Sequence, residues 1–354
     1  MKTKYEQLAD KLREDIFQGI YQKGEMIPSE NKLQKETKFS RYTVRQAIAV
    51  LADEGLLVTE RGSGTYVAQA LNEKGQKTVG VIMTYLSDYI FPSIIRGIEK
   101  ELSKKGYSIL LGTTNNNHAK ERECLERMMT QNVAGLIVEP TKSNEYNPNL
   151  SYYAMLDQKN IPLLMINAYY EELEVPHICV DDSKSGYLAT KYLIDQGHEK
   201  LLLVNKLDDL QGKYRRKGYF KAMQEAGLVF SDQDIVTYTT ETKESAVQMI
   251  VQKLTKADRQ YTAVVAYNDE MANFIINALD QKGLAIPQKL SIIGNDDSSI
   301  TNNKKIGLTT LTHPKEKMGE LAAKRAIDMI TGKKAEDFYF EPELIERESV
   351  CEIK

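Results

Sequence analysis

The chain has 354 residues, of which 42% are hydrophobic and 27% charged, and its formal net charge is −3. These values are typical of a globular protein with two or three domains and exclude a disordered or fibrous chain. No run approaches 18 apolar residues and the polar N-terminus has no signal-peptide pattern, so we expect a cytoplasmic protein without membrane contact. The three cysteines are far apart in the sequence and form no metal-binding pattern.

The first 68 residues predict three helices followed by a β-hairpin. Apolar side chains recur every four residues over Tyr5–Ile20, which indicates an amphipathic helix. Ser29 is expected to cap a second helix, and Ser40 to cap a third helix over Arg41–Glu54. Two short β-prone runs between residues 56 and 67 flank a glycine-containing turn. This order is that of a winged helix-turn-helix, whose third helix enters the major groove of DNA.

The N-terminal end of the third helix carries the side chains best suited to DNA. Arg41 and Arg45 offer guanidinium forks to guanine, and the hydroxyls of Tyr42 and Thr43 suit phosphate oxygens. Arg61, in the hairpin turn, could reach an adjacent minor groove. Two arginines on a helix are often only a solvated surface, so these residue types alone do not decide the matter.

Four pieces of this region have the order and spacing of the GntR-type winged-helix domain. They are Ile27–Leu33 (IPSENKL), Ser40–Ala47 (SRYTVRQA), Gly55–Leu57 (GLL) and Gly62–Val67 (GSGTYV). The chain departs from the family at Lys38-Phe39, where a glycine followed by an aliphatic residue is usual. The resemblance covers residues 1–68 and implies that this domain contacts DNA. With neighbouring outward-facing positions, the predicted contacts are Lys4, Tyr5, Glu30, Arg41, Tyr42, Thr43, Arg45, Gln46, Arg61 and Gly62.

Residues 69–77 are polar, lack apolar periodicity and predict a linker. From residue 78 to 354, apolar strands alternate with amphipathic helices, which predicts an α/β fold with two doubly wound parallel-sheet lobes behind the small α+β winged helix. The predicted strands are 79–83, 108–112, 135–139, 163–166, 201–205, 235–238, 263–267 and 291–294, and the predicted helices are 91–105, 120–131, 183–196, 214–226, 245–256, 270–282 and 315–330.

Polar residues follow several of these strands at their carboxyl ends, where ligands bind in sheets of this type. Examples are Asn167, Asn268 and Asp296. Planar amide, carboxylate and guanidinium groups suit the paired hydroxyls of a sugar, and an aromatic ring suits its C–H face. A neutral polyol needs no metal, so we expect a sugar ligand and no cofactor.

Further motifs, spread over residues 78–350, are similar to the effector domain of the LacI/GalR family, a relative of periplasmic sugar-binding proteins. They are Leu136–Val138, Gly197-His198, Arg215 with Gly218, Tyr267–Ala272, Ile286-Pro287, Leu290–Asp297 and Leu308–Leu311. A GntR-type head on such a domain resembles the L-arabinose-responsive repressors of Gram-positive bacteria, and segments 84–92, 138–143 and 340–344 share that resemblance. It implies a homodimer on double-stranded operator DNA that is released by L-arabinose.

The resemblance also implies effector contacts. Arg215, Asn268 and Asp296 occupy positions that bind effector hydroxyls in the family, and Asp88 and Phe91 match polar and aromatic positions after the first strand. The other predicted contacts are Asn167 and His313, from the same resemblance, and Glu139 and Lys206, from their places at strand ends.

Several of these residues also have a purely structural alternative. Asp296 could belong to a helix cap, Asn268 could cap the helix that follows it, and Phe91 could lie in the core. Lys206 could be an ordinary surface charge, and His313 a turn residue before a proline.

At the level of function, two alternatives stay open. One is the same architecture responding to another sugar, and the other is a carbohydrate-active enzyme such as a sugar kinase. No phosphate-binding loop and no HExxH motif occurs in the sequence. The pair Asp181-Asp182 is a weak basis for acid–base catalysis. We therefore predict a repressor and not an enzyme.

Overall fold

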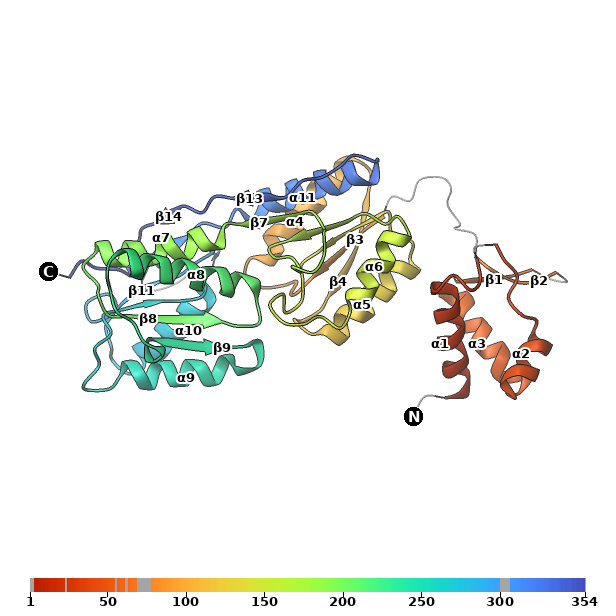
Figure 1. The fold of residues 1–354 in the computed structure, drawn as a ribbon, viewed down its shortest axis with the longest axis horizontal. Coiled ribbons are helices and arrows are strands. Elements are labelled where there is room, and N and C mark those ends of the chain that lie inside the picture. The colour runs from red at the N-terminus through yellow and green to blue at the C-terminus, as the bar shows by residue number, and fades with distance from the viewer. Residues whose placement is uncertain are drawn as a thin grey trace. The chain divides into compact units, whose positions relative to one another are not determined.

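The computed structural model describes residues 3–22, 24–54, 56–60, 63–68, 78–299 and 306–353, apart from the side chain of Phe17. The chain divides into two compact units, one built mainly from residues before 78 and the other mainly from residues after it (Figure 1). The predicted linker and the predicted DNA contacts Arg61 and Gly62 lie outside the described residues. None of the described helices is long and apolar enough to cross a membrane.

The first unit contains three helices and an antiparallel strand pair. They are α1 (Lys4–Phe17), α2 (Glu30–Thr37), α3 (Arg41–Asp53), β1 (Leu57–Glu60) and β2 (Gly64–Val67). Ser29 and Ser40 cap α2 and α3 through their hydroxyl oxygens, which accept hydrogen bonds from the backbone N–H groups of Lys32 and Thr43. Apolar residues from all three helices and both strands form one core, including Leu8, Leu12, Leu33, Val44, Leu51, Leu57 and Val67.

Two left-handed residues define the ends of helices in this unit. The prediction that α1 continues to Ile20 is wrong: the helix ends at Phe17, and Gly19 has a φ of 76° that a helix cannot continue. Lys38 caps α2 with a φ of 58°. A residue without a Cβ adopts that conformation at lower cost, which explains why glycine is usual at this position.

The second unit consists of two α/β lobes (Figure 1). The first lobe has a six-stranded sheet in the order β13-β7-β6-β5-β3-β4, with every neighbouring pair parallel. Its strands are β3 (Thr78–Met83), β4 (Ser108–Thr113), β5 (Gly135–Val138), β6 (Leu163–Ile166), β7 (His177–Val180) and β13 (Phe338–Phe340). Its helices are α4 (Phe91–Lys104), α5 (His118–Thr130), α6 (Leu150–Gln158) and α11 (Lys315–Ile330). Buried residues of β3, β5, β6 and β7 pack with α4 and α11.

The second lobe has a four-stranded parallel sheet in the order β11-β10-β8-β9. Its strands are β8 (Leu201–Lys206), β9 (Ile235–Tyr238), β10 (Ala263–Val265) and β11 (Ser291–Ile293). Its helices are α7 (Asp182–Asp195), α8 (Leu210–Glu225), α9 (Lys243–Leu254) and α10 (Asp269–Asp280), with short 3-10 turns at Asp232–Asp234 and Thr240–Thr242. Two buried clusters fill the two faces of this sheet.

The C-terminal part of the chain returns to both lobes. After β12 (Thr310–Leu311) the chain forms α11 and β13 in the first lobe, and then β14 (Leu344–Ile345), which pairs with β12. The sequence did not predict β7, β12, β13, β14 or α6. These strands have two to four residues each, and β13 lies beside β7 through pairs such as Phe338 with Ile178, which no local pattern predicts.

The first two helices of the second lobe, α7 and α8, pack closely against each other. A Cβ on Gly218 of α8 would lie 2.1 Å from the carbonyl oxygen of Ser183, and a Cβ on Gly186 of α7 would lie 2.0 Å from that of Arg215. Only residues without a side chain allow α7 and α8 to approach so closely. This contact places Arg215 at the junction of the two lobes.

Candidate functional site

In the first unit, an acidic side chain joins the two predicted DNA-reading arginines. Glu30 accepts hydrogen bonds from Nε of Arg41 at 3.2 Å and from Nε of Arg45 at 3.0 Å. Partial burial acts to raise the pKa of Glu30, but the hydrogen bonds from Arg45 and Arg41 outweigh it and lower that pKa. The two arginine side chains are still 61% and 58% exposed, so their outer guanidinium nitrogens are open to a ligand.

The other predicted DNA contacts that the structure describes differ in how far their side chains are exposed. Tyr42 is 71% exposed, and its hydroxyl accepts a hydrogen bond from Nε2 of Gln46 at 3.2 Å. Lys4, at the start of α1, is exposed, and Thr43, in the first turn of α3, is half-buried. Tyr5 packs against the core of the unit, as expected for the first residue of the apolar pattern of α1. The roles of these residues in DNA contact stay predictions.

In the second unit, one cavity of about 330 Å³ is lined by residues of both lobes. All nine residues predicted for effector contact line it: Asp88, Phe91, Glu139, Asn167, Lys206, Arg215, Asn268, Asp296 and His313. Most of them follow strands of the two parallel sheets, as ligand-binding residues do in folds of this class.

Arg215, on α8, is held from three sides at the base of this cavity. Its Nε donates to Asp182 at 2.8 Å, its Nη2 to Asp296 at 3.1 Å and its Nη1 to the carbonyl oxygen of Tyr267 at 2.7 Å. Burial alone would lower the pKa of Arg215, but Asp296 and Asp182 hold it above its ordinary value. Burial raises the pKa of Asp182 to about 6, against the opposing effect of Arg215. The guanidinium plane is therefore fixed before any ligand binds.

A second chain of hydrogen bonds runs along the wall formed by the first lobe. Glu139 accepts from the backbone N–H of Thr84 at 2.9 Å and from Nδ2 of Asn167 at 2.7 Å. The Oδ1 atom of Asn167 lies 3.1 Å from Nε2 of His313. Burial lowers the pKa of His313 to about 4, so its imidazole is neutral at pH 7. Burial also raises the pKa of Glu139, although the hydrogen bonds from Thr84 and Asn167 oppose it.

Lys206, at the end of β8, is not an ordinary surface charge, because only 12% of its side chain is exposed. Its Nζ lies 2.6 Å from Oδ2 of Asp209 and 3.2 Å from Oδ1 of Asp208. Burial acts to lower the pKa of Lys206, but Asp209 and Asp208 outweigh it and raise that pKa. The hydroxyl of Tyr267 donates to the same oxygen of Asp209 at 2.9 Å. This amine is thus neutralised by carboxylates before it meets a ligand.

The structural alternatives have mixed outcomes. Asn268 does cap α10, because its Oδ1 accepts from the backbone N–H of Met271 at 2.9 Å, and it also lines the cavity. Phe91 packs in the core of the first lobe, yet it too reaches the cavity wall. Asp296 caps none of the described helices, and its carboxylate bonds Arg215 and the hydroxyl of Tyr89.

Sequence reasoning missed several polar residues of the cavity wall: Tyr89, Asn116, Asp182, Asp209 and Tyr267. Asp182 belongs to the acidic pair that was considered only for catalysis, and Tyr267 directly precedes Asn268. Tyr89 follows Asp88 and has a left-handed φ of 63°. Only Tyr89 and Tyr267 are adjacent to a predicted contact, whereas Asn116, Asp182 and Asp209 have no such neighbour in the sequence.

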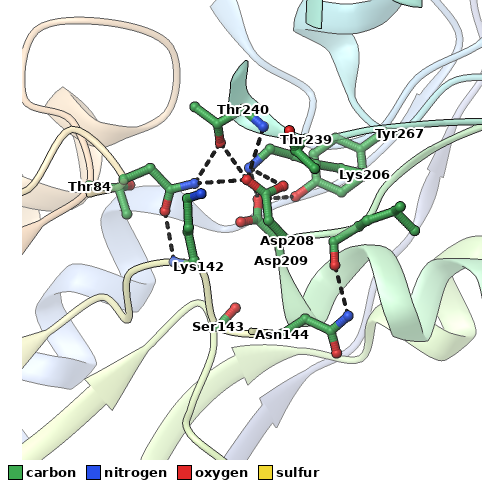
Figure 2. Close-up of polar contacts among 12 residues, drawn as sticks. Thr84, Lys142, Ser143, Asn144, Lys206, Asp208, Asp209, Thr239, Thr240 and Tyr267 are labelled. Carbon is green, nitrogen blue, oxygen red and sulfur yellow. Dashed lines mark hydrogen bonds and ion pairs between the residues drawn. The ribbon is translucent and has the colours of Figure 1, made fainter. Parts of the chain in front are cut away.

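Polar contacts also join the two lobes beside the cavity (Figure 2). Asn116 of the first lobe donates through Nδ2 to Oγ1 of Thr240 at 2.7 Å, and its Nδ2 lies 3.4 Å from Oδ2 of Asp208. Asn144 donates through Nδ2 to the carbonyl oxygen of Leu207 at 2.7 Å. The lobes are therefore held together by direct protein–protein hydrogen bonds.

The chemistry of the cavity suits recognition more than reaction. Its three cationic side chains, Lys206, Arg215 and Lys243, all contact carboxylates. In the described part of the chain, no three His, Cys, Asp or Glu side chains form a group that could hold a metal ion. The wall offers many fixed donors and acceptors together with the aromatic rings of Tyr85 and Phe91, whose centroids are 5.5 Å apart. Such a set recognises hydroxyls and C–H faces.

Comparison with known protein families identifies both parts of the chain. Residues 4–67 match the bacterial regulatory proteins of the gntR family, and residues 190–350 match the periplasmic binding protein-like domain. A relative from Halalkalibacterium halodurans, described as an arabinose metabolism transcriptional repressor, is 42% identical, and the match covers 100% of this chain and 98% of that protein. A Geobacillus stearothermophilus protein with the same description is 39% identical over 99% of this chain and 98% of its own.

Solved structures show the same fold for the second unit. The transcription regulator CcpA of Lactococcus lactis is similar with a TM-score of 0.69 and 24% identity, over 78% of this chain and 100% of that one. A periplasmic binding protein/LacI transcriptional regulator from Alkaliphilus metalliredigens, complexed with D-xylulofuranose, has a TM-score of 0.65 and 26% identity, over 77% of this chain and 99% of its own.

Proposed function

The chain belongs to the family of GntR-type transcriptional repressors with a periplasmic-binding-protein-like domain, and on that premise we propose that it represses arabinose-metabolism genes and releases its operator when L-arabinose binds. It is a DNA-binding repressor and not an enzyme. The identity of the sugar, the dimeric state and the release by sugar are the parts that we propose.

On the DNA side, we propose that α3 reads the major groove through Arg41 and Arg45. Both guanidinium groups are exposed and share Glu30, which holds them side by side. A single winged helix reads only a half-site, so we propose that two chains bind one operator as a homodimer.

On the effector side, the observation that carries the proposal is the convergence of nine predicted residues on one cavity between the lobes. Buried amide, carboxylate and guanidinium groups with fixed orientations favour a polyhydroxylated ligand. The cations of the wall are already compensated by carboxylates, so an uncharged sugar fits better than an anion. The two relatives described as arabinose repressors support L-arabinose as that sugar.

The proposed mechanism couples the two sites through the lobes. Sugar bound between the lobes favours their closed arrangement, which changes the dimer and misaligns the two winged helices with their half-sites. Sugar and operator then oppose each other through one coupling free energy, typically about 1–3 kcal/mol, which weakens DNA binding roughly 5–150-fold.

A second candidate keeps this architecture and changes the sugar. The similar regulator from Alkaliphilus metalliredigens is complexed with D-xylulofuranose, and another from Enterococcus faecium has bound ribose. Both ligands are five-carbon sugars, so the panel used to test the proposal must contain other pentoses.

The test is fluorescence anisotropy of the full-length protein on labelled DNA from upstream of its own gene, at fixed salt because salt strongly shifts such affinities. We expect tight binding that L-arabinose releases, whereas D-xylose, D-ribose and D-galactose do not. Release by another pentose would keep the repressor and replace the effector. Failure to bind this DNA under any condition would contradict the operator proposal.

A further inference from the structure

The two lobes make a set of contacts that no sugar mediates. Loops after β4 and β5 of the first lobe meet the loop after β8 and the 3-10 turn after β9 of the second lobe (Figure 2). Two backbone amides donate across this junction: that of Asn144 to the carbonyl oxygen of Asp208 at 3.2 Å, and that of Leu210 to Oγ of Ser143 at 2.8 Å. We call these contacts, with those of Asn116 and Lys142, the interlobe bridge.

Asn116 can serve the bridge because an amide has both a donor and an acceptor. Its Oδ1 accepts from the backbone N–H of Lys142 in its own lobe at 2.8 Å, while its Nδ2 donates to Thr240 in the other lobe. Asn116 is only 3% exposed, and Asp208 is fully buried. Buried hydrogen bonds of this kind are costly to break, because both partners lose their compensation.

The outer end of the bridge is an ion pair. Nζ of Lys142 lies 2.7 Å from Oε1 of Glu241 in the second lobe and 3.6 Å from Oε2 of Glu145 in its own lobe. The hydrogen bond from Lys142 lowers the pKa of Glu241 to about 2, so the pair is charged at neutral pH. Neither Lys142 nor Glu241 lines the cavity. Four other residues line the cavity and also form the bridge or contact one of its members: Asn116, Ser143, Lys206 and Thr240.

We propose that the interlobe bridge stabilises the closed arrangement without a ligand, and that Lys142 and Glu241 are positioning residues that set the sugar affinity without touching the sugar. The inference rests on the proposed function, since it concerns the same cavity. A sugar that binds the closed arrangement has an apparent affinity proportional to the closed fraction, so any contact that changes this fraction changes the affinity.

A charge reversal with a matched control tests this. Glu241→Lys puts two cations at the junction and should raise the apparent Kd for L-arabinose about two- to fivefold, the range for one exposed ion pair. Lys142→Glu should do the same, and the double variant Lys142→Glu/Glu241→Lys should return to the wild-type value. Glu145→Lys makes an identical charge change beside the same lysine, but within one lobe, and should leave the Kd unchanged.

Calorimetry of the full-length protein with L-arabinose gives these values. Hydrogen exchange of the Asn144 and Leu210 amides, measured without sugar, reports the bridge independently. Both amides should exchange faster in Glu241→Lys, and at the wild-type rate in Glu145→Lys and in the double variant. Equal effects of Glu241→Lys and Glu145→Lys, or no recovery in the double variant, would contradict the proposed role of the interlobe bridge. If the wild type fails to bind L-arabinose, the proposed effector is wrong, and the exchange rates still decide whether the bridge exists.

Discussion

Two arginine sites of this protein use the same side chain in opposite ways. In the first unit, Arg41 and Arg45 share one carboxylate, and about three-fifths of each side chain is exposed. In the second unit, Arg215 is 9% exposed and bonds two carboxylates and a carbonyl oxygen. The first pair keeps guanidinium N–H donors open for a partner, whereas all three guanidinium nitrogens of Arg215 donate to groups of the protein.

The difference indicates how each site meets its ligand. An exposed guanidinium can exchange water for a phosphate or a base edge at little cost, which suits a large charged partner. A buried guanidinium between Asp182 and Asp296 instead fixes the carboxylates that face a small neutral ligand. If the two arginine sites are independent, a substitution in one of them leaves ligand binding at the other unchanged.

The largest effect is expected for Arg215→Ala. It leaves Asp182 and Asp296 buried without their cation, a loss of about 3–5 kcal/mol. Sugar binding should become undetectable by calorimetry, while operator binding persists and no longer responds to sugar. A normal response to sugar would remove Arg215 from the effector site.

Because Arg215→Ala also threatens folding, Asp296→Asn serves as a milder variant. It keeps the shape of the side chain and removes one charge next to Arg215. We expect weakened sugar binding with an unchanged thermal unfolding midpoint of the first unit. Loss of operator binding in both variants would mean that the two sites are not independent.

The converse variant is Arg45→Ala. Losing one bidentate base contact costs about 1–3 kcal/mol, and a dimer loses it in both half-sites. Operator binding measured by anisotropy should fall at least tenfold, while the Kd for sugar stays at the wild-type value. A variant that loses both activities would be misfolded, which circular dichroism would reveal.

A pH-dependent effect is expected at His313. Its pKa is lowered to about 4 in the folded chain by burial, against the opposing charge of Asp296. The unfolded chain therefore takes up this proton first as the pH falls below about 6.5, and stability is lost at roughly 1.4 kcal/mol per pH unit down to about pH 4. In His313→Gln this contribution is absent.

The measurement is denaturant unfolding of both proteins at pH 7.5 and pH 5. Other groups cancel in the comparison, including Asp182, whose raised pKa acts in the opposite direction. The wild type should lose about 2 kcal/mol more than His313→Gln between the two values. Equal losses would show that His313 is not held neutral.

The smallest effect concerns the charge of the ligand. Lys206, Arg215 and Lys243 are all paired with carboxylates, so a phosphorylated pentose meets no free cation among the described residues of the cavity wall. In competition calorimetry it should bind at least about tenfold, or 1.4 kcal/mol, more weakly than L-arabinose. Equal or tighter binding of the phosphorylated pentose would contradict the view that carboxylates already compensate these three cations.

The sequence predicted most of the framework, because long apolar runs and periodic helices are local signals. It failed for β13 and β14, whose two or three residues gain their stability from partners far away in the chain. For the cavity, motif positions such as Arg215 and Asp296 could be predicted. Asp182, Asp209 and Tyr267 could not, because their roles arise from hydrogen bonds made only when the strand ends meet.

The central claim is that sugar and operator oppose each other through one coupling free energy. The direct measurement is the Kd for L-arabinose by calorimetry, with and without saturating operator DNA, set beside the Kd for operator with and without saturating sugar. The account predicts that both affinities fall by the same factor, between about 5 and 150. A sugar affinity that is the same on free and operator-bound protein would contradict it.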